Sequence, residues 1–225
     1  MDPRQALQTN SIDYPTRDGR PMGETDDHRK EMQVFLIEVL EDYFQRDPNV
    51  YVSGNNFLYY NEGVLGDCVC PDLYVVKGVP NGQRDTYKVW EEGGRVPCLV
   101  IEVTSKNTRM EDLGDKMAKY RDVLGVREYI MFDPRAEWIP TRLRGYLLQD
   151  GVYQPMSAGP SGRLSSPELG LELVTVGRHL RFYAPGATEP LPTRVERADN
   201  AEEENRRLRA ELNRLRGGEQ GPERP

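Results

Sequence analysis

Apolar and polar positions follow two different periods along the chain, and these periods predict strands and helices. Short apolar runs bounded by Gly, Asn or Pro are typical of strands. Such runs occupy residues 50–53, 57–60, 73–76, 97–103, 127–132, 141–148, 152–156, 171–176 and 180–183. A stripe with a helical period predicts a helix over residues 27–46. Its apolar residues are Met32, Leu36, Val39, Leu40 and Tyr43, with Glu31 and Glu38 on the far side.

The middle of the chain follows the order strand, helix, strand. Residues 112–124 carry Leu113, Met117 and Tyr120 at helical spacing, between the apolar runs 97–103 and 127–132. This order predicts two parallel strands joined by a crossover helix. The later strands, with a primed turn at Asp150–Gly151, predict an antiparallel extension that covers the core. The sequence therefore predicts an α/β fold with a central mixed sheet, flanking helices and a β-rich C-terminal extension.

The two ends of the chain differ from the middle. Residues 1–25 lack periodicity and predict a loose arm, whereas residues 26–190 form one domain of ordinary size. Within residues 191–225 a helix begins near Thr193, and its apolar side steps by three and four residues. The seam consists of Ala198, Ala201, Asn205, Leu208, Leu212 and Leu215. It predicts a short coiled coil and a possible homodimer; the alternative is an amphipathic tail on a monomer.

Composition narrows the function. The chain has a net charge of −7, three cysteines and two histidines in 225 residues. Three cysteines without an export signal indicate reduced, buried thiols, and two histidines exclude a His-rich metal site. No apolar run reaches the roughly 20 residues that span a membrane, so we expect a cytoplasmic protein with no membrane partner. The acidic charge argues against a broad nucleic-acid surface, but a local basic groove remains compatible with it.

Two carboxylates interrupt apolar strands and are the strongest chemical signal. Asp72 precedes Leu-Tyr-Val-Val, and Glu102 lies inside Cys-Leu-Val-Ile-Glu-Val. Burying an ionised carboxylate without a partner costs several kcal/mol, so a cation should lie beside Glu102. Lys116 is placed to reach it from the crossover helix. Two carboxylates and a lysine suit Mg²⁺, which prefers oxygen ligands and keeps water in its shell.

An ordered set of motifs resembles the Uma-two family of putative restriction endonucleases, within the PD-(D/E)XK nuclease superfamily. The motifs are Pro71-Asp72, Leu-Val-Ile-Glu102-Val-Thr-Ser105, Asp112-Leu-Gly-Asp-Lys116 with Tyr120, Gly125-Val-Arg-Glu-Tyr129 and Asp133-Pro134. The resemblance runs from about residue 28 to the C-terminus and implies a restriction-endonuclease-like core. The superfamily pattern has Lys two residues after the Glu, where this chain has Thr104. The resemblance suggests that the lysine has moved to the helix, which favours Lys116 over Lys106.

The resemblance implies a Mg²⁺-dependent endonuclease that acts on DNA, with Mn²⁺ as a substitute ion. Asp72, Glu102 and Lys116 would be the catalytic residues. The metal would bind Asp72, Glu102 and the main-chain carbonyl of Val103. Supporting positions are assigned to three further residues: Ser105, Asp112 and His28. His28 also fits a helix cap, and Asp112 also fits a first-turn acid that complements the helix dipole.

Two alternatives use the same residues. In the first, Glu102 and Lys116 form a buried salt bridge without metal or turnover. In the second, the chain is a catalytically inactive nuclease-fold protein that acts as an interaction and dimerisation module. Thr104 and the acidic net charge favour the second alternative. Metal binding separates both from the enzyme.

Overall fold

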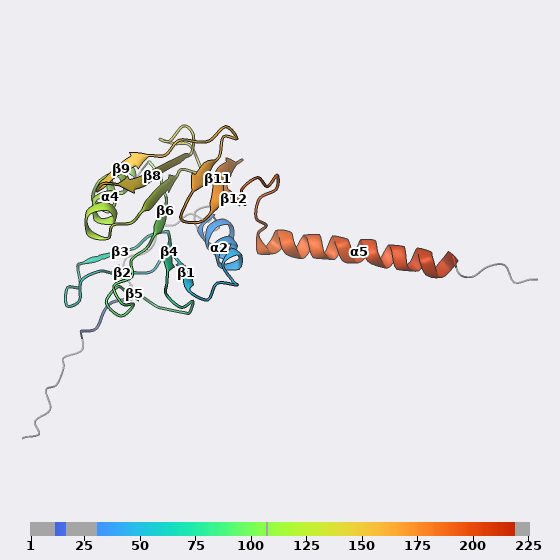
Figure 1. Cartoon of the computed structure of the whole chain (residues 1–225), viewed down its shortest axis with the longest axis horizontal. Coiled ribbons are helices and arrows are strands. Elements are labelled where there is room, and N and C mark those ends of the chain that lie inside the picture. The colour runs from blue at the N-terminus through green and yellow to red at the C-terminus, as the bar shows by residue number, and fades with distance from the viewer. Residues whose placement is uncertain (1–11, 17–30, 107, 219–225) are drawn as a thin grey trace, which may run out of the picture.

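The computed structural model describes residues 12–16, 31–106 and 108–218 (Figure 1). Its centre is a six-stranded sheet in the order β1-β4-β6-β7-β8-β9. Only β6 and β7 pair in parallel, and the other neighbours are antiparallel. The strands are β1 (Val50–Ser53), β4 (Leu73–Lys77), β6 (Leu99–Val103), β7 (Glu128–Phe132), β8 (Leu143–Gln149) and β9 (Val152–Pro155). The predicted α/β class, mixed sheet and parallel pair are confirmed.

Every residue of β6 and β7 is buried, because helices and smaller sheets cover both faces of the centre. One face packs against the first helical segment and the sheet of β10 (Leu164–Ser166), β11 (Leu171–Val176) and β12 (His179–Tyr183). The other face packs on Tyr120, Leu124 and a group of buried tyrosines. The β8–β9 turn has positive φ at both Asp150 and Gly151, as a primed turn requires.

One of the predicted strands, over residues 57–60, belongs to a separate small sheet and not to the central one. Residues 57–60 contribute only β2 (Leu58–Tyr59), which lies between β3 (Cys68–Val69) and β5 (Tyr87–Lys88). Part of the predicted N-terminal arm packs here. Tyr14 contacts the rings of Tyr59 and Trp90, and the Tyr59 hydroxyl donates to the Pro15 carbonyl at 2.7 Å.

The first predicted helix is irregular where it is described. It consists of a π-helix η1 (Glu31–Ile37) and α2 (Glu38–Tyr43), and it ends before residue 46. Tyr43, predicted on the apolar stripe, is 40% exposed. His28 lies outside the described residues. Glu31 was predicted on the polar side, but it is buried and accepts hydrogen bonds from the Leu180 amide and the His179 ring. Packing of β12 on η1 covers that side of the helix.

The crossover helix is divided into three pieces rather than running unbroken over 112–124. These are α3 (Arg109–Leu113), α4 (Asp115–Ala118) and the π-helix η2 (Lys119–Val123). Gly114 separates the first two with a non-helical backbone (φ −101°, ψ −104°). The break turns Leu113 outward and Asp112 inward. The predicted apolar face therefore holds at Tyr120 and partly at Met117, but not at Leu113.

The three cysteines are free thiols, and each is partly buried rather than fully buried as predicted. Burial raises the pKa of the Cys98 thiol to about 12. Its Sγ donates to the Val75 carbonyl at 3.4 Å. These thiols therefore behave as small packing groups.

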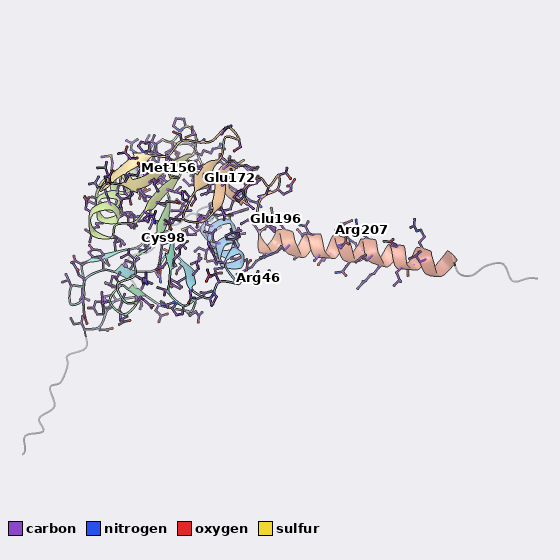
Figure 2. The ribbon with its side chains drawn as sticks, in the orientation of Figure 1. Arg46, Cys98, Met156, Glu172, Glu196 and Arg207 are labelled. Carbon is purple, nitrogen blue, oxygen red and sulfur yellow. The ribbon has the colours of Figure 1, made fainter. Side chains whose placement is uncertain are left out.

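The terminal helix α5 (Arg194–Gly218) projects away from the body as an isolated rod (Figures 1 and 2). Thr193 caps its start, because the Glu196 amide donates to the Thr193 hydroxyl and the Thr193 amide donates to the Glu196 carboxylate. Arg194 and Arg197 pair with Asp42 on α2. No helix within the described ranges is both long and apolar enough to cross a membrane.

We predict that Gly54→Ala destabilises the fold, because an added Cβ would lie 1.9 Å from the main-chain oxygen of Asp72. Backbone atoms on both sides must move, which should lower the free energy of unfolding by about 1–3 kcal/mol. Urea unfolding measures this change. Gly66→Ala is the control, since its Cβ meets no atom within 4 Å. Equal effects of the two substitutions would contradict the close approach at Gly54.

Candidate active site

Strand register brings Asp72 and Glu102 together. In the antiparallel pair β4–β6, Leu73 lies opposite Ile101, so the next step outward sets Asp72 opposite Glu102. Opposed residues of an antiparallel pair project from the same face, with Cβ atoms about 5 Å apart. The Asp72 carboxylate also accepts a hydrogen bond from the Val103 amide at 2.7 Å. This bond fixes the start of β4 against the end of β6.

Two side chains from the crossover segment meet the buried Glu102 carboxylate. The Lys116 ammonium lies 3.1 Å from one carboxylate oxygen, and the Tyr120 hydroxyl donates to the other at 2.6 Å. Lys116 and Tyr120 are four residues apart, so they lie on the same side of the helical segment. The cation that burial of Glu102 requires is therefore Lys116.

Asp112 is the third carboxylate of this cluster. It is buried, its carboxylate lies 3.4 Å from the Lys116 ammonium, and it accepts a hydrogen bond from the Thr104 hydroxyl at 2.6 Å. The Tyr129 hydroxyl donates to its main-chain oxygen at 2.9 Å. Asp112 also occupies the first turn of α3, as a dipole-complementing acid would. Its carboxylate also contacts the Lys116 ammonium, so its position is compatible with both of the roles given above.

Burial raises the pKa of Glu102 to about 8, and the negative charges of Asp72 and Asp112 add to this effect, while Lys116 and Tyr120 oppose it. Burial alone would favour the neutral form of Lys116. The carboxylates of Glu102, Asp72 and Asp112 outweigh it and raise the pKa of the Lys116 ammonium above its ordinary value. The lysine is therefore charged at neutral pH. Once Glu102 is ionised as well, three carboxylates surround one ammonium and leave an excess of negative charge.

The remaining predicted residues that the structure describes, Val103 and Ser105, follow Glu102 closely in the chain. The Ser105 hydroxyl accepts from the Thr108 amide at 3.3 Å at the start of α3. Val103 ends β6, beside Glu102. Lys106 is exposed, and its amide donates to Glu137 at 3.1 Å, which ties the loop after β6 to the loop after β7. His28 lies outside the described residues.

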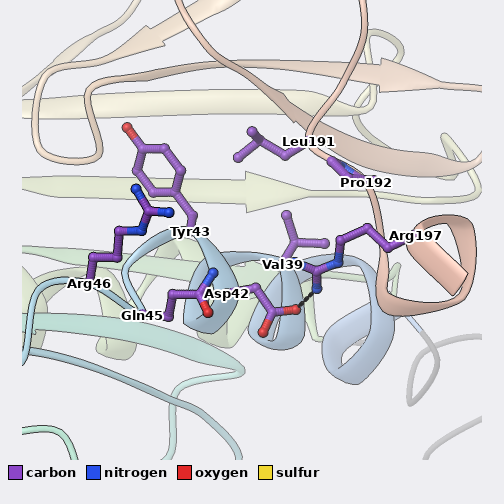
Figure 3. A pocket seen from close by; sticks show the side chains of 8 residues that line it. All are labelled: Val39, Asp42, Tyr43, Gln45, Arg46, Leu191, Pro192 and Arg197. Carbon is purple, nitrogen blue, oxygen red and sulfur yellow. Dashed lines mark hydrogen bonds and ion pairs between the residues drawn. The ribbon is translucent and has the colours of Figure 1, made fainter. Parts of the chain in front are cut away.

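Two hollows of the described surface lie away from this cluster. One, of about 310 Å³, lies between α2 and the start of α5 and is lined by Tyr43, Arg46 and Arg197 among others (Figure 3). The other, of about 560 Å³, is lined by Lys77, Glu168 and neighbouring residues. Among the described side chains, no three His, Cys, Asp or Glu converge closely enough to hold a metal ion by themselves.

Some contributions were not visible in the sequence. The helical spacing predicts Tyr120 on the apolar face, yet its hydroxyl donates a hydrogen bond to the Glu102 carboxylate. Thr104 stands where the superfamily pattern has a lysine, and its hydroxyl donates a hydrogen bond to the Asp112 carboxylate. A Tyr on a helical stripe four residues after a candidate lysine is the one signal that could have indicated the first contact.

Comparison with known families agrees with the resemblance seen in the motifs. The model of the Uma2 family, described as "Putative restriction endonuclease", matches residues 5–180 of the 225-residue chain. The chain belongs to the Uma2 family. Asp72, Glu102, Lys116 and Tyr120 all fall within the matched span.

The Uma2 chain is also similar to a solved structure from Anabaena variabilis, described as a "putative nuclease belonging to DUF820". The two share 13% sequence identity, with a TM-score of 0.42 over 65% of this chain and 81% of the other. No protein among the curated sequences matches. The family assignment therefore rests on the family match.

We predict that Tyr120→Phe destabilises this Uma2 protein more than Tyr153→Phe does. Both changes remove one hydroxyl donor, but Tyr120 donates to the Glu102 carboxylate and Tyr153 to the Val126 carbonyl. At about pH 9, where Glu102 is ionised, the losses should be about 1.5–3 and 0.5–1.5 kcal/mol respectively. Urea unfolding of both variants measures the difference. A smaller loss for Tyr120→Phe would show that its hydroxyl does not support the charged carboxylate.

The raised pKa of Glu102 also predicts a pH dependence of stability. A carboxyl whose pKa lies near 8 in the fold and near 4.5 when unfolded stabilises the fold below pH 4.5, and this contribution is lost as pH rises through 8. Relative to Glu102→Gln, the wild type should lose up to about 1.4 kcal/mol per pH unit over this window. Urea unfolding in chelator across pH 5–8 tests the slope. Parallel curves for the two proteins would contradict the shift.

Proposed function

We propose that the chain is a metal-dependent endonuclease that hydrolyses phosphodiester bonds in DNA, as a member of a restriction endonuclease family. The observation that supports this most directly is the meeting of Asp72, Glu102 and Lys116 at the end of β6. Stability alone gives little reason for such a cluster in the core, because a buried ion pair gains little over apolar packing. An excess of negative charge at one point instead suits a bound cation.

The donor set fits Mg²⁺. The carboxylates of Asp72 and Glu102 and the main-chain oxygen of Val103 are hard oxygen ligands, and Mg²⁺ completes such a shell with water and substrate phosphate. Two of the three carboxylates in the cluster would thus bind the ion, and no three His, Cys, Asp or Glu side chains of the described chain converge to hold it by themselves. Mn²⁺ accepts the same ligands. When bound, the ion supplies Lewis-acid chemistry at the phosphate.

The side chains of the cluster have separate tasks in this proposal. Lys116 keeps its positive charge at neutral pH and stabilises the negative charge that develops on the scissile phosphate. Asp112, held by Thr104, keeps the ammonium beside Glu102. Tyr120 fixes the other oxygen of Glu102, so that the carboxylate cannot rotate away. Lys116, Asp112 and Tyr120 all belong to the crossover segment, so their positions depend on how that segment packs on the sheet.

DNA can approach this edge despite the acidic net charge. Lys106 and Arg135 are exposed on the loops that leave β6 and β7, the strands whose carboxyl ends meet at the cluster. Glu137 joins the two loops through the Lys106 amide and lies 3.9 Å from Arg135. Two cations at this edge would contact phosphates on either side of the reacting one.

We predict that Lys116→Ala lowers Mg²⁺-dependent nicking of supercoiled plasmid by roughly 10²–10³-fold, because it removes a preorganised positive charge. Lys119→Ala is the matched control, since it makes the same change one turn later, outside the cluster. Calorimetry should show that Lys116→Ala keeps Mg²⁺ or Mn²⁺ binding, whereas Glu102→Gln loses it along with nicking.

Two results would overturn the proposal. If the wild type neither binds the ions nor nicks DNA, the Glu102–Lys116 pair is a structural salt bridge and the chain is an inactive nuclease-fold module. If Lys116→Ala and Lys119→Ala nick equally well, Lys116 has no part in the chemistry. Thermal unfolding of each variant separates lost activity from lost folding.

A further inference from the structure

The apolar side of α5 is exposed along its length and has no partner within the described chain. Leu208, Leu212 and Leu215 are 51%, 46% and 60% exposed. The helix leaves the body after its first turns, so the body cannot cover these residues (Figures 1 and 2). An exposed helix with one apolar seam is marginal in water by itself. A second helix that covered these side chains would therefore stabilise α5.

The spacing of the seam specifies a coiled coil. Asn205 and Leu212 fall at heptad position a, and Leu208 and Leu215 fall at position d. The helix of 25 residues is about 37 Å long at 1.5 Å per residue, enough for three heptads after its anchored start. A single polar Asn at an a position is the device that selects a two-stranded, in-register pair.

Charges beside the seam select the partner and its direction. Glu204 occupies position g and Arg209 the following position e, so each pair across a parallel, in-register dimer joins opposite charges. In an antiparallel pair the g positions face one another, and Glu204 and Glu211 would repel. Glu204 also contacts Arg207 of its own helix at 2.8 Å, but both side chains are largely exposed and this pair can coexist with a second cation.

We propose that α5 binds the α5 of a second copy of this chain as a parallel, two-stranded coiled coil. Across the interface the two helices bury the side chains of Leu208, Leu212 and Leu215 against one another. Asn205 of one copy contacts Asn205 of the other. The base of the rod is already fixed. Arg181 holds Glu196 at 2.7 Å, and Asp42 holds Arg194 and Arg197. Both bodies then lie at the same end of the coiled coil.

Sedimentation equilibrium of the full chain tests the association. The wild type should pass from monomer to dimer as concentration rises, while Leu212→Asp stays monomeric over the same range. Because Leu212 is exposed in the single chain, the melting temperature of Leu212→Asp at low concentration should match that of the wild type. A wild type that remains monomeric at every concentration overturns the proposal, whatever its nuclease activity.

Charge reversal tests the partner and register. Arg209→Glu sets Glu beside Glu204 across both edges and should raise the dissociation constant at least about tenfold. Adding Glu204→Arg restores opposite charges and should return it to within about threefold of the wild type. If the double substitution does not rescue association, the pairing is not parallel and in register.

Direct cross-linking tests the direction of the helices. Asn205→Cys should form an interchain disulfide under mild oxidation, because equal a positions adjoin in a parallel pair. Asn213→Cys is the matched control, since the same substitution lies on the outer side of the helix. The wild type, with its three native thiols, gives the background. Equal cross-linking of the two variants would overturn the parallel arrangement.

Discussion

The burial of one carboxylate, that of Glu102, is the constraint on which the centre of this protein depends. β6 is covered on both faces, so the charge cannot be left to water. The crossover segment must therefore deliver a cation and a hydroxyl to the same point, and Lys116 and Tyr120 do so from positions four residues apart. The helix that covers the sheet is thereby also part of the site. A change that shifts its packing would shift the ammonium as well.

Thr104 shows how the position of the lysine affects the rest of the cluster. The side chain at 104 is buried and its hydroxyl lies 2.6 Å from Asp112, so there is little room for a long cationic chain at the end of β6. Lys116 instead supplies a positive charge beside Glu102 from the crossover segment. Asp112 then gains importance, because it fixes the lysine against rotation away from the strand.

The sequence predicted the sheet more completely than the helices. Runs such as Leu-Val-Ile-Glu-Val specify a buried strand almost unaided, and the order strand, helix, strand fixed the parallel pair of β6 and β7. The helices depended on tertiary contacts that periodicity does not contain. Gly114 divides the crossover segment and rotates Asp112 inward, and β12 covers the side of η1 that carries Glu31. The contact of Lys116 with Glu102 could be predicted because burial of a charge demands a partner, whereas the Thr104–Asp112 bond depends on the break at Gly114.

The terminal helix differs from the body in how its apolar residues are covered. The body buries its apolar residues within one chain, whereas the Leu side chains of α5 are exposed to water in the single chain. What joins the two parts is a small set of charged contacts at the base, in which Asp42 on α2 meets both Arg194 and Arg197. In a parallel pair these contacts would set the angle between each body and the common rod. Each copy would carry one cluster of Asp72, Glu102, Asp112 and Lys116, and both clusters would lie at the same end of the coiled coil. The distance between them would therefore depend on α2, although α2 contributes no residue to either cluster.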